Sequence, residues 1–424
     1  MAQKPFLKSI RPANLLSFSP RTEEIELRSL NILIGPNGSG KSNLIELIGL
    51  LRSLPDKEPW DIVLQAGGAK EWIWKGRDAG KAQPSLSVKA SGSLYPARPQ
   101  GLLNAARRDR EMPPSMSEKP ISYELALRER ESGFEVERES FREADRWEND
   151  AIQTPWFERD GWVGQTHSSA LPADSPDRFS NLAPSRSVLS MYGLTNISTH
   201  VPAIQKFSES LEAVAIYRDW VFGSNSRLRE PQAAGLDSYR LAADSGNLAQ
   251  VLKAWRDRGD QAVFERLVEF LRMFYAPIKD VDTELLGTYL RIMIKEDGLS
   301  SRTPAERLSD GTLRWLMLLI ILLDPLPPPV ICIDEPELGL HPDMLPVLAD
   351  LLVEASTRTQ LIVTTHSRSF LDSFTETPEY ICVCEKTEGS TVIQRLDSDR
   401  LKVWLDDYSL GKLWTNGQIG GNRW

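Results

Sequence analysis

Three short apolar runs along the chain predict strands that are buried on both faces. They cover residues 30–34, 330–333 and 361–363, and small or polar residues follow each of them. Such runs are typical of parallel strands that helices cover on both sides. Residues 5–34 also alternate in short apolar segments around a turn at residues 19–21, which predicts two strands leading into the phosphate-type motif described below. The chain therefore favours an α/β fold.

Alternation of apolar and polar residues predicts an additional, antiparallel sheet. Leu86 and Val88 alternate with polar residues, and residues 121–127 repeat the pattern. A turn at residues 131–133 leads into another alternating run through Phe134 and Val136, as in a β-hairpin. Glu and Arg residues occupy the remaining positions, and we interpret them as the solvated face of the sheet. The alternative is a surface that binds nucleic acid.

Helical spacing dominates from about residue 201. Apolar residues recur every three or four positions in residues 248–255 and 263–274, with charged residues between them, as in helices that pack on a core. Residues 279–297 predict another hairpin, and residues 313–323 predict a helix. Prolines and serines are frequent in residues 95–120 and 154–192, which we interpret as two long surface loops.

Residues 35–42 satisfy the pattern of a phosphate-binding loop: Gly, four free positions, Gly, Lys, and Ser or Thr. Glycine allows the backbone to turn tightly toward phosphate oxygens, and the helix predicted from Lys41 to about Ser53 directs its N-terminus at the same anion. We expect Lys41 to reach the β- and γ-phosphates and Ser42 to ligate Mg²⁺. The candidate nucleotide-binding residues of this loop are Gly35, Asn37, Gly38, Ser39, Gly40, Lys41, Ser42 and Asn43.

Ionisable residues end the other two apolar runs. Asp334 and Glu335 follow the run at 330–333, where two carboxylates are costly unless they have partners or a function. We assign Asp334 to the Mg²⁺ shell and Glu335 to the polarisation of the attacking water. His366 ends the run that begins at Leu361, and its imidazole could donate to a phosphate oxygen or to the water, so we assign it to γ-phosphate sensing.

Ser309 and Gly311 stand directly before the helix predicted at 313–323. A serine, a glycine and a helix N-terminus can form a second anion-binding turn. By itself, Ser-Asp-Gly is a common start of a helix. The assignment of this turn therefore depends on the other motifs.

Composition narrows the setting in which this chemistry would occur. The chain has 424 residues and a formal net charge of −9, so the molecule as a whole has no basic footprint for nucleic acid or an anionic membrane. The longest apolar run, residues 315–323, is far shorter than the ~20 residues of a membrane helix. The N-terminus lacks a signal-peptide core, which favours a cytoplasmic protein. The three cysteines, Cys332, Cys382 and Cys384, are expected to be buried thiols.

Four stretches together resemble the ATP-binding-cassette (ABC) ATPase superfamily, specifically its non-transporter branch of SMC, RecF and OLD-like heads. They are GPNGSGKSN (35–43), LSDGT (308–312), CIDEPELGLHP (332–342) and VTTHS (363–367). The resemblance implies a P-loop NTPase head with a mixed sheet, an antiparallel β-subdomain and a helical lobe. The expected parts are an N-terminal ATPase lobe (1–92), a β-hairpin and long-loop insertion (93–200), a helical lobe (201–300), and the remaining ATPase motifs with a C-terminal tail (301–424).

The resemblance also implies a mechanism in which two heads sandwich two Mg·ATP and hydrolysis releases them. In such a homodimer Ser309 and Gly311 would contact the γ-phosphate held by the second protomer, and residues 337–341 would cross the interface. Three features depart from the family: Asp310 replaces a common glycine, no glutamine stands out as the lid-loop Mg²⁺ ligand, and no coiled-coil arm interrupts the head.

Free-standing heads of this kind resemble ATPase subunits of bacterial anti-phage defence systems, which control a separately encoded effector such as a nuclease. A RecF-like DNA-repair ATPase that binds DNA directly is the first alternative. The energising subunit of a membrane transporter is the second, and the long loops and the wide spacing between Lys41 and Asp334 argue against it. The basic cluster Arg107, Arg108 and Arg110 could form a local contact with DNA.

The C-terminal part holds two further features. Glu385, Asp397 and Asp399 resemble faintly the metal-binding acids of a Toprim nuclease, but too few residues follow His366 for such a domain, so we interpret them as surface acids. Residues 413–424, with two tryptophans and three glycines, differ from an ordinary frayed tail. They could dock onto the head or onto a partner.

Overall fold

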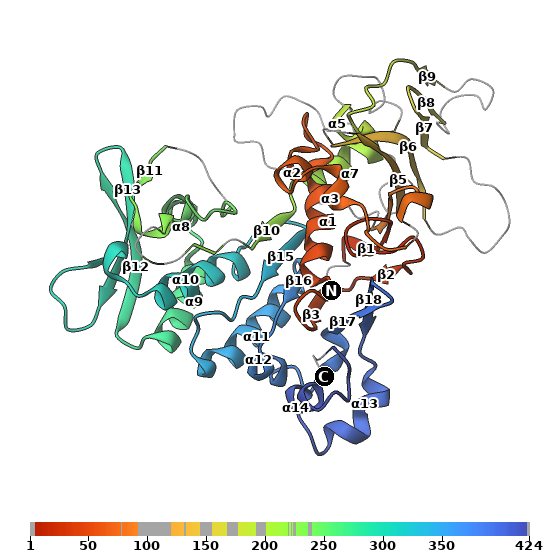
Figure 1. Ribbon diagram of the computed structural model, residues 1–424. Helices are drawn as coiled ribbons and strands as arrows, with labels where there is room; N and C mark the ends of the chain where they lie inside the picture. The colour runs from red at the N-terminus through yellow and green to blue at the C-terminus, as the bar shows by residue number, and fades with distance from the viewer. Residues whose placement is uncertain are drawn as a thin grey trace.

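The computed structural model describes residues 5–77, 79–91, 120–130, 133–144, 155–167, 177–191, 201–218, 220, 221, 223, 226–235 and 240–421. Three sheets and their helices build this part of the chain (Figure 1). One sheet is largely parallel, one is antiparallel, and a small third sheet belongs to a projecting lobe. The α/β class that the apolar runs predicted is confirmed.

The six-stranded sheet has the order β10-β15-β16-β3-β17-β18. Its neighbours pair in parallel except β17 and β18, which form an antiparallel hairpin at the edge. All three predicted apolar runs are strands of this sheet and lie side by side. The strands are β3 (Leu30–Ile34), β10 (Ala215–Tyr217), β15 (Val330–Asp334), β16 (Gln360–Thr364), β17 (Ile381–Thr387) and β18 (Ser390–Arg395).

Side chains of this sheet alternate between two hydrophobic cores. In β3, Ile32 and Ile34 belong to one core, whereas Leu33 between them belongs to the other. All three cysteines are buried in the sheet, as expected, and Cys332, Cys382 and Cys384 lie in the same core as Leu33. Because both faces are covered, the strands are largely apolar, and a polar side chain within them, such as Asn31 of β3, is hydrogen-bonded.

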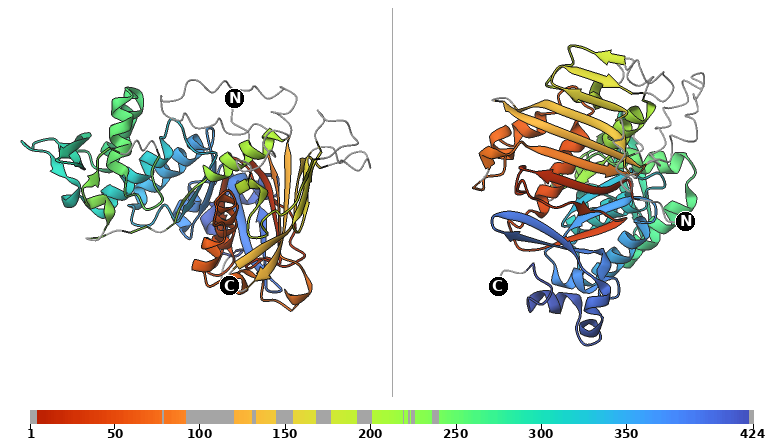
Figure 2. Two further views of the ribbon diagram at one scale, coloured as in Figure 1. Left: turned by 90° about the horizontal axis from the view of Figure 1, so that it is seen from above. Right: turned by 90° about the vertical axis from the view of Figure 1, so that its right-hand side faces the viewer.

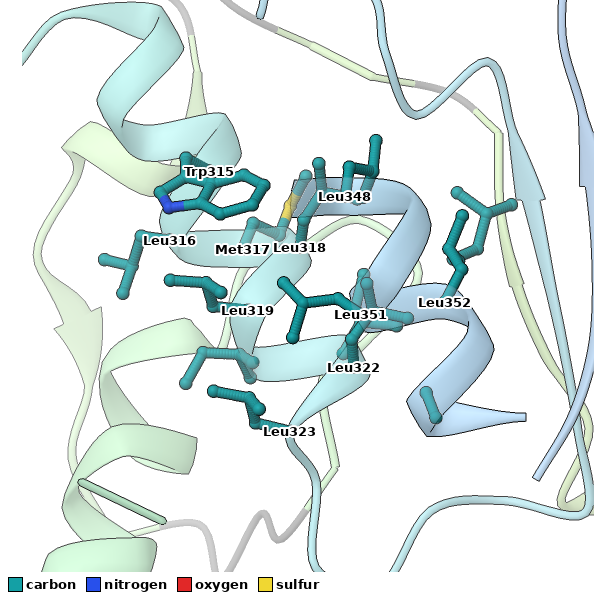
Figure 3. Packing of buried hydrophobic residues seen from close by; sticks show 14 of the residues in the cluster. Trp315, Leu316, Met317, Leu318, Leu319, Leu322, Leu323, Leu348, Leu351 and Leu352 are labelled. Carbon is teal, nitrogen blue, oxygen red and sulfur yellow. The ribbon is translucent and has the colours of Figure 1, made fainter. Parts of the chain in front are cut away.

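Helices cover both faces. The first core contains α10 (Asp310–Leu322) and α11 (Leu345–Ala355), whose leucines pack against one another, among them Leu322 and Leu351 (Figure 3). Helix α10 starts three residues earlier than the sequence predicted. The second core joins α1 (Lys41–Ser53) to both larger sheets, and α1 has the predicted bounds. Pro55 follows its last residues, where no helix can continue.

The antiparallel sheet has eight strands in the order β2-β1-β4-β5-β6-β7-β8-β9. The hairpin predicted from residue 121 is confirmed as β5 and β6, and several Arg–Glu pairs lie on its exposed face, including Arg128 with Glu137. The strands are β1 (Leu7–Ala13), β2 (Ile25–Glu26), β4 (Ser85–Ala90), β5 (Ile121–Arg130), β6 (Gly133–Glu143), β7 (Phe157–Asp160), β8 (Val163–Thr166) and β9 (Asp177–Phe179).

Two interpretations of this region are wrong. Residues 154–192 are not simply a long loop, because β7, β8 and β9 extend the sheet there and α5 (Val188–Met191) follows. Glu139 is not solvated: it is fully buried, and it accepts hydrogen bonds from the Tyr123 hydroxyl (2.7 Å) and the Val188 N–H (2.9 Å). Burial raises the pKa of Glu139. The second predicted loop, residues 95–120, lies almost entirely outside the described residues, together with Arg107, Arg108 and Arg110.

A third group of elements projects from the sheets (Figures 1 and 2). Its hairpin, predicted at residues 279–297, is confirmed as β12 and β13. Trp315 of α10 joins the lobe to the sheets, since its ring stacks on Phe274 and its indole N–H donates to the Phe270 carbonyl at 2.8 Å. The elements are α8 (Leu248–Asp257), α9 (Gln261–Phe274), β11 (Gln232–Ala233), β12 (Ile278–Leu286), β13 (Tyr289–Glu296) and β14 (Thr303–Pro304).

Shorter helices complete the described chain. No helix in it is long and apolar enough to cross a membrane. The helices not yet named are α2 (Asp61–Gln65), α3 (Ala69–Trp72), α7 (Pro202–Glu212), α12 (Arg368–Asp372), α13 (Ser398–Leu405) and α14 (Leu410–Thr415).

Candidate nucleotide-binding site

The phosphate-type loop connects β3 directly to α1, as the pattern predicted. Gly38 and Gly40 have φ angles of 77° and 102°, a region that side chains rarely adopt. A Cβ atom on Gly40 would also lie 2.1 Å from Thr391 Oγ1. Glycine is therefore required at this position both by the backbone turn and by the close packing of the β18 hairpin.

Lys41 is buried and folds back over the loop. Its ammonium donates hydrogen bonds to the backbone carbonyls of Gly35 (2.7 Å) and Pro36 (3.1 Å). Burial lowers the pKa of Lys41, and the nearby carboxylates of Glu335 and Asp334 act in the opposite direction. The structure thus places the lysine of the phosphate loop within electrostatic reach of the acids at the end of β15.

The other residues of the loop differ in accessibility. Asn37 and Gly38 are exposed, and Ser42 and Asn43 are half-buried. Ser39 is buried, and its Oγ has no hydrogen-bond partner among the described residues. The exposed backbone at the tip of the loop is the part that a phosphate could approach.

Asp334 ends β15 beside β16, and a threonine of that strand holds it. Thr364 donates its hydroxyl proton to Asp334 Oδ1, and the Trp220 indole donates to the Asp334 backbone carbonyl at 2.6 Å. The carboxylate is therefore oriented by a neighbouring strand.

Glu335 has a left-handed backbone, with φ of 48°. Such a conformation costs about 1–3 kcal/mol for a residue other than glycine and persists only where its surroundings hold it. Here the Glu335 N–H donates to the carbonyl (3.1 Å) and the hydroxyl (3.2 Å) of Thr364. The turn directs the carboxylate toward His366, whose Nε2 lies 3.5 Å from Glu335 Oε1.

Burial, together with the charge of Asp334, raises the pKa of Glu335. Lys41 and Arg314 have the opposite effect. A carboxylate with a raised pKa, with a histidine 3.5 Å away, is suited to accept a proton from a water molecule or to hold that water in place. The predicted acid and the predicted histidine are thus adjacent.

Ser42 and Asp334 offer a hydroxyl and a carboxylate oxygen, the hard donors that Mg²⁺ prefers. A magnesium ion in a nucleotide site takes only one or two protein ligands because phosphates and water supply the others. The donor set fits such an ion. The described residues contain no group of three or more His, Cys, Asp or Glu side chains that could hold a metal ion.

Two further residues complete the site: Glu337, which the sequence analysis placed only in the interface loop, and Arg314, which it did not single out. Glu337 is buried and accepts hydrogen bonds from the Thr365 hydroxyl and the His366 N–H (3.4 Å), so it joins the loop after β15 to the histidine. Arg314 of α10 donates to the Glu335 carbonyl at 2.6 Å. One sequence signal existed for Arg314: it is the only charge between Leu313 and Leu323.

Ser309 caps α10 and is exposed. Its Oγ accepts a hydrogen bond from the Thr312 N–H at 3.1 Å. Asp310, which departs from the family pattern, pairs with Arg229 and accepts from the Gly223 N–H, and these bonds lower its pKa. Gly311 lies beneath the loop after β15, since a Cβ on it would be 3.4 Å from the Gly339 carbonyl oxygen.

The structure therefore brings together Lys41, Asp334, Glu335 and His366. Ser309 and Gly311 lie on the first turn of α10, which is connected to these four residues through Arg314 and through the loop after β15. The candidate nucleotide site thus lies at one edge of the six-stranded sheet, and the N-terminus of α10 is a second, separate feature.

The sequence matches a protein family described as "AAA domain, putative AbiEii toxin, Type IV TA system" over residues 30–372. The chain belongs to this family. The match spans the phosphate loop, the α10 start, the acids after β15 and His366, so this AAA domain contains every predicted site residue. No curated protein matches the sequence.

Solved SMC heads share the fold of this AAA domain. A structure titled "Crystal structure of the SmcHead bound to the C-winged helix domain of ScpA" matches with a TM-score of 0.54 and 14% identity, over 93% of this chain and 99% of the other. An Smc head with an extended coiled coil from Pyrococcus furiosus, bound to the C-terminal domain of ScpA, matches with a TM-score of 0.54 and 13% identity, over 95% and 99%. The AAA domain thus has the fold of an SMC head domain.

Proposed function

We propose that this chain binds and hydrolyses ATP, and that ATP joins two copies of it into a dimer. The observation that carries the proposal is the convergence of Lys41, Asp334, Glu335 and His366 at the ends of three adjacent parallel strands. Polar and charged groups at the carboxyl edge of such a sheet mark its ligand site.

Each of these residues has a role that its surroundings support. The backbone N–H groups of the phosphate loop and Lys41 bind the phosphates. Ser42 and Asp334 would hold Mg²⁺, which neutralises phosphate charge when bound. Glu335 orients the attacking water and accepts its proton, and His366 donates to the γ-phosphate or to Glu335.

Two variants separate binding from hydrolysis. Lys41→Ala should lose ATP binding, because it removes the cation that faces the triphosphate. Glu335→Gln should still bind ATP but lose turnover by on the order of a hundredfold or more, since the amide cannot take the proton. Equilibrium binding and phosphate release measured on both variants test this. Near wild-type turnover in Glu335→Gln would refute the assignment.

The exposed start of α10 supports the dimer. Ser309 and Gly311 sit on an accessible helix N-terminus, apart from the phosphate loop of their own chain, so they are free to meet the nucleotide of a second copy. The loop of residues 337–341 lies against Gly311 and would run along the same interface.

We further propose that the dimer is a switch in a bacterial anti-phage defence system and controls a separately encoded effector, such as a nuclease. The family description, which includes a toxin of a toxin–antitoxin system, supports this setting over DNA repair. The identity of the neighbouring gene is the direct test: a nuclease-like reading frame favours defence, and a recombination gene favours the RecF-like alternative.

A further inference from the structure

The C-terminal segment Leu410–Gly421 docks onto the head, which is one of the two alternatives that the sequence left open for residues 413–424; residues 422–424 lie outside the described part of the chain. Helix α14 packs on α12, the helix that follows His366. Backbone N–H groups of Leu410 and Gly411 donate to Thr375 Oγ1 (3.3 Å) and Asp372 Oδ1 (2.8 Å). Leu410, Leu413 and Ile419 are buried in the core that contains α10.

Two glycines near the end of this segment form a left-handed turn. Gly420 and Gly421 have φ angles of 74° and 69°. Glu385 of β17 accepts a hydrogen bond from the Gly421 N–H at 2.7 Å, and the Trp414 indole donates to the Gly421 carbonyl at 2.9 Å. The turn is thus held on both sides, by a strand of the sheet and by α14.

This turn lies against the first glycine of the phosphate loop. A Cβ on Gly421 would be 2.7 Å from Val383 Cγ1 and 3.5 Å from the Cα of Gly35. A Cβ added to Gly35 itself would lie only 2.2 Å from the Cys384 carbonyl oxygen. The entry to the loop is therefore confined by β17 and by the C-terminal turn.

Gly35 is also the residue whose carbonyl holds the Lys41 ammonium at 2.7 Å. Glu385 is thus hydrogen-bonded to Gly421, Gly421 lies beside Gly35, and the Gly35 carbonyl accepts from Lys41. An outward movement of the turn would release one side of Gly35 and with it the carbonyl that orients Lys41.

We infer that Glu385 and the Gly420–Gly421 turn position the phosphate loop for the triphosphate. The inference rests on the proposed ATP binding and adds to it a determinant of affinity that lies outside the phosphate-loop motif. The turn fixes the phosphate loop before ATP binds. The conformational entropy of the loop is therefore lost during folding and does not reduce the affinity for ATP. Removing the contact should therefore weaken ATP binding and leave the hydrolytic residues intact.

The test uses the full chain with four substitutions and Mg·ATP as the probe. Gly421→Ala pushes the turn away from Val383 and Gly35, and Glu385→Ala removes its acceptor, whereas Glu385→Gln keeps an oxygen at the same place. Gly298→Ala is the matched control, because Gly298 has φ of 76° and open space around its Cβ position. Readouts are the Kd for ATP, kcat, and the midpoint of thermal unfolding.

We expect Gly421→Ala and Glu385→Ala to raise the Kd for ATP by about tenfold, the loss that corresponds to one hydrogen bond or one strained turn. Their kcat at saturating ATP should stay within about twofold, as for a loss of uniform binding. Glu385→Gln should restore most of the affinity, and Gly298→Ala should leave the Kd unchanged.

Two results would overturn the inference: an unchanged Kd in the folded Glu385→Ala variant, or tighter binding, which would make the turn an obstacle to ATP. Glu385 is exposed, so this variant remains informative even if Gly421→Ala fails to fold. A different result would refute the proposed function itself: Lys41→Ala would bind ATP as tightly as the wild type does.

Discussion

Arg314 donates a hydrogen bond from α10 to the backbone carbonyl of Glu335 at 2.6 Å, and so connects the helix that starts at Ser309 to the proposed base. Its guanidinium lies 4.8 Å from the ring centre of Trp220, whose indole in turn donates to the Asp334 carbonyl. Burial lowers the pKa of Arg314 to about 10. The backbone carbonyls of Glu335 and Asp334 are therefore bonded, respectively, to Arg314 of α10 and to Trp220, which Arg314 contacts.

Replacement of this arginine should slow hydrolysis more than it weakens ATP binding. Arg314→Met keeps the aliphatic length but leaves the Glu335 carbonyl without this donor, at a cost of about 1–3 kcal/mol in the free energy of unfolding. Since Glu335 loses one of the bonds that hold its strained turn, we expect kcat to fall by about tenfold or more, while the Kd for ATP changes by less than about threefold.

Arg358→Met is the control for that variant. Arg358 donates to the Leu322 carbonyl at 2.7 Å, at the other end of α10 and away from the site. It should lose comparable stability and keep its kcat. An equal loss of kcat in both variants would show that Arg314 acts only through the stability of the helix.

Self-association should depend on ATP and on Ser309. In the Glu335→Gln background, ATP should double the mass measured by light scattering, because the trapped nucleotide joins two copies. An added Ser309→Arg should abolish the dimer, since the long side chain projects into the interface, and should leave ATP binding to the monomer. Asp399→Arg adds the same group on exposed α13 and should still dimerise. If the mass of every variant were the same with and without ATP, the proposed ATP-bound dimer would be refuted.

Stability should change with pH through Asp324, which lies beyond the end of α10. Burial raises the pKa of this carboxyl from 3.8 to about 6. The folded state therefore holds a proton on Asp324 that the unfolded state releases, and the contribution of Asp324 to the free energy of unfolding falls as the pH rises from about 4 to 6. Relative to the wild type, the free energy of unfolding of Asp324→Asn should rise by up to about 3 kcal/mol over that interval, and the difference should stay constant at higher pH. Urea unfolding between pH 4.5 and 7.5 measures the difference, and a flat difference would contradict the prediction.

The purified chain should not cleave DNA by itself. Asp397 caps α13 by accepting from the N–H groups of Asp399 (3.0 Å) and Arg400 (3.4 Å), so it has a structural partner. Glu385 is bonded to Gly421, and the described residues hold no cluster of acids suited to a metal. Plasmid and linear DNA in Mg²⁺ or Mn²⁺, with and without ATP, should remain intact. Cleavage that survives Lys41→Ala but is lost in Asp399→Ala would contradict this.

The sequence predicts best those parts of the fold whose pattern is local. Strands β3, β15 and β16 are uninterrupted or nearly uninterrupted apolar runs, and α1 is bounded by Gly40 and Pro55. The predicted bounds of these elements are therefore close to those in the structure. Strands β7, β8 and β9 were missed because they have only three or four residues each, too few to establish alternation among the serines and prolines.

In the site, the motifs predicted which residues would meet but not what holds them. Trp220 and Asp334 are separated by 114 positions, and no local pattern links an isolated tryptophan to a distant acid. The pairing of Thr365 with Glu337 depends on the register of β15 and β16, which the sequence does not specify. The roles of Glu335, His366, Ser309 and the Mg²⁺ ligands stay predictions that the variants above test.

The burial of the three cysteines has a practical consequence for labelling. A thiol reacts as the thiolate, and burial raises the pKa of Cys332 to about 12 and the pKa values of Cys382 and Cys384 as well. Maleimide dyes and spin labels should therefore leave the native thiols unmodified. A cysteine introduced at Val403, where the side chain is 78% exposed, would be the single reactive position in each copy. Distances between two copies, with and without ATP, then become measurable in the otherwise unaltered chain.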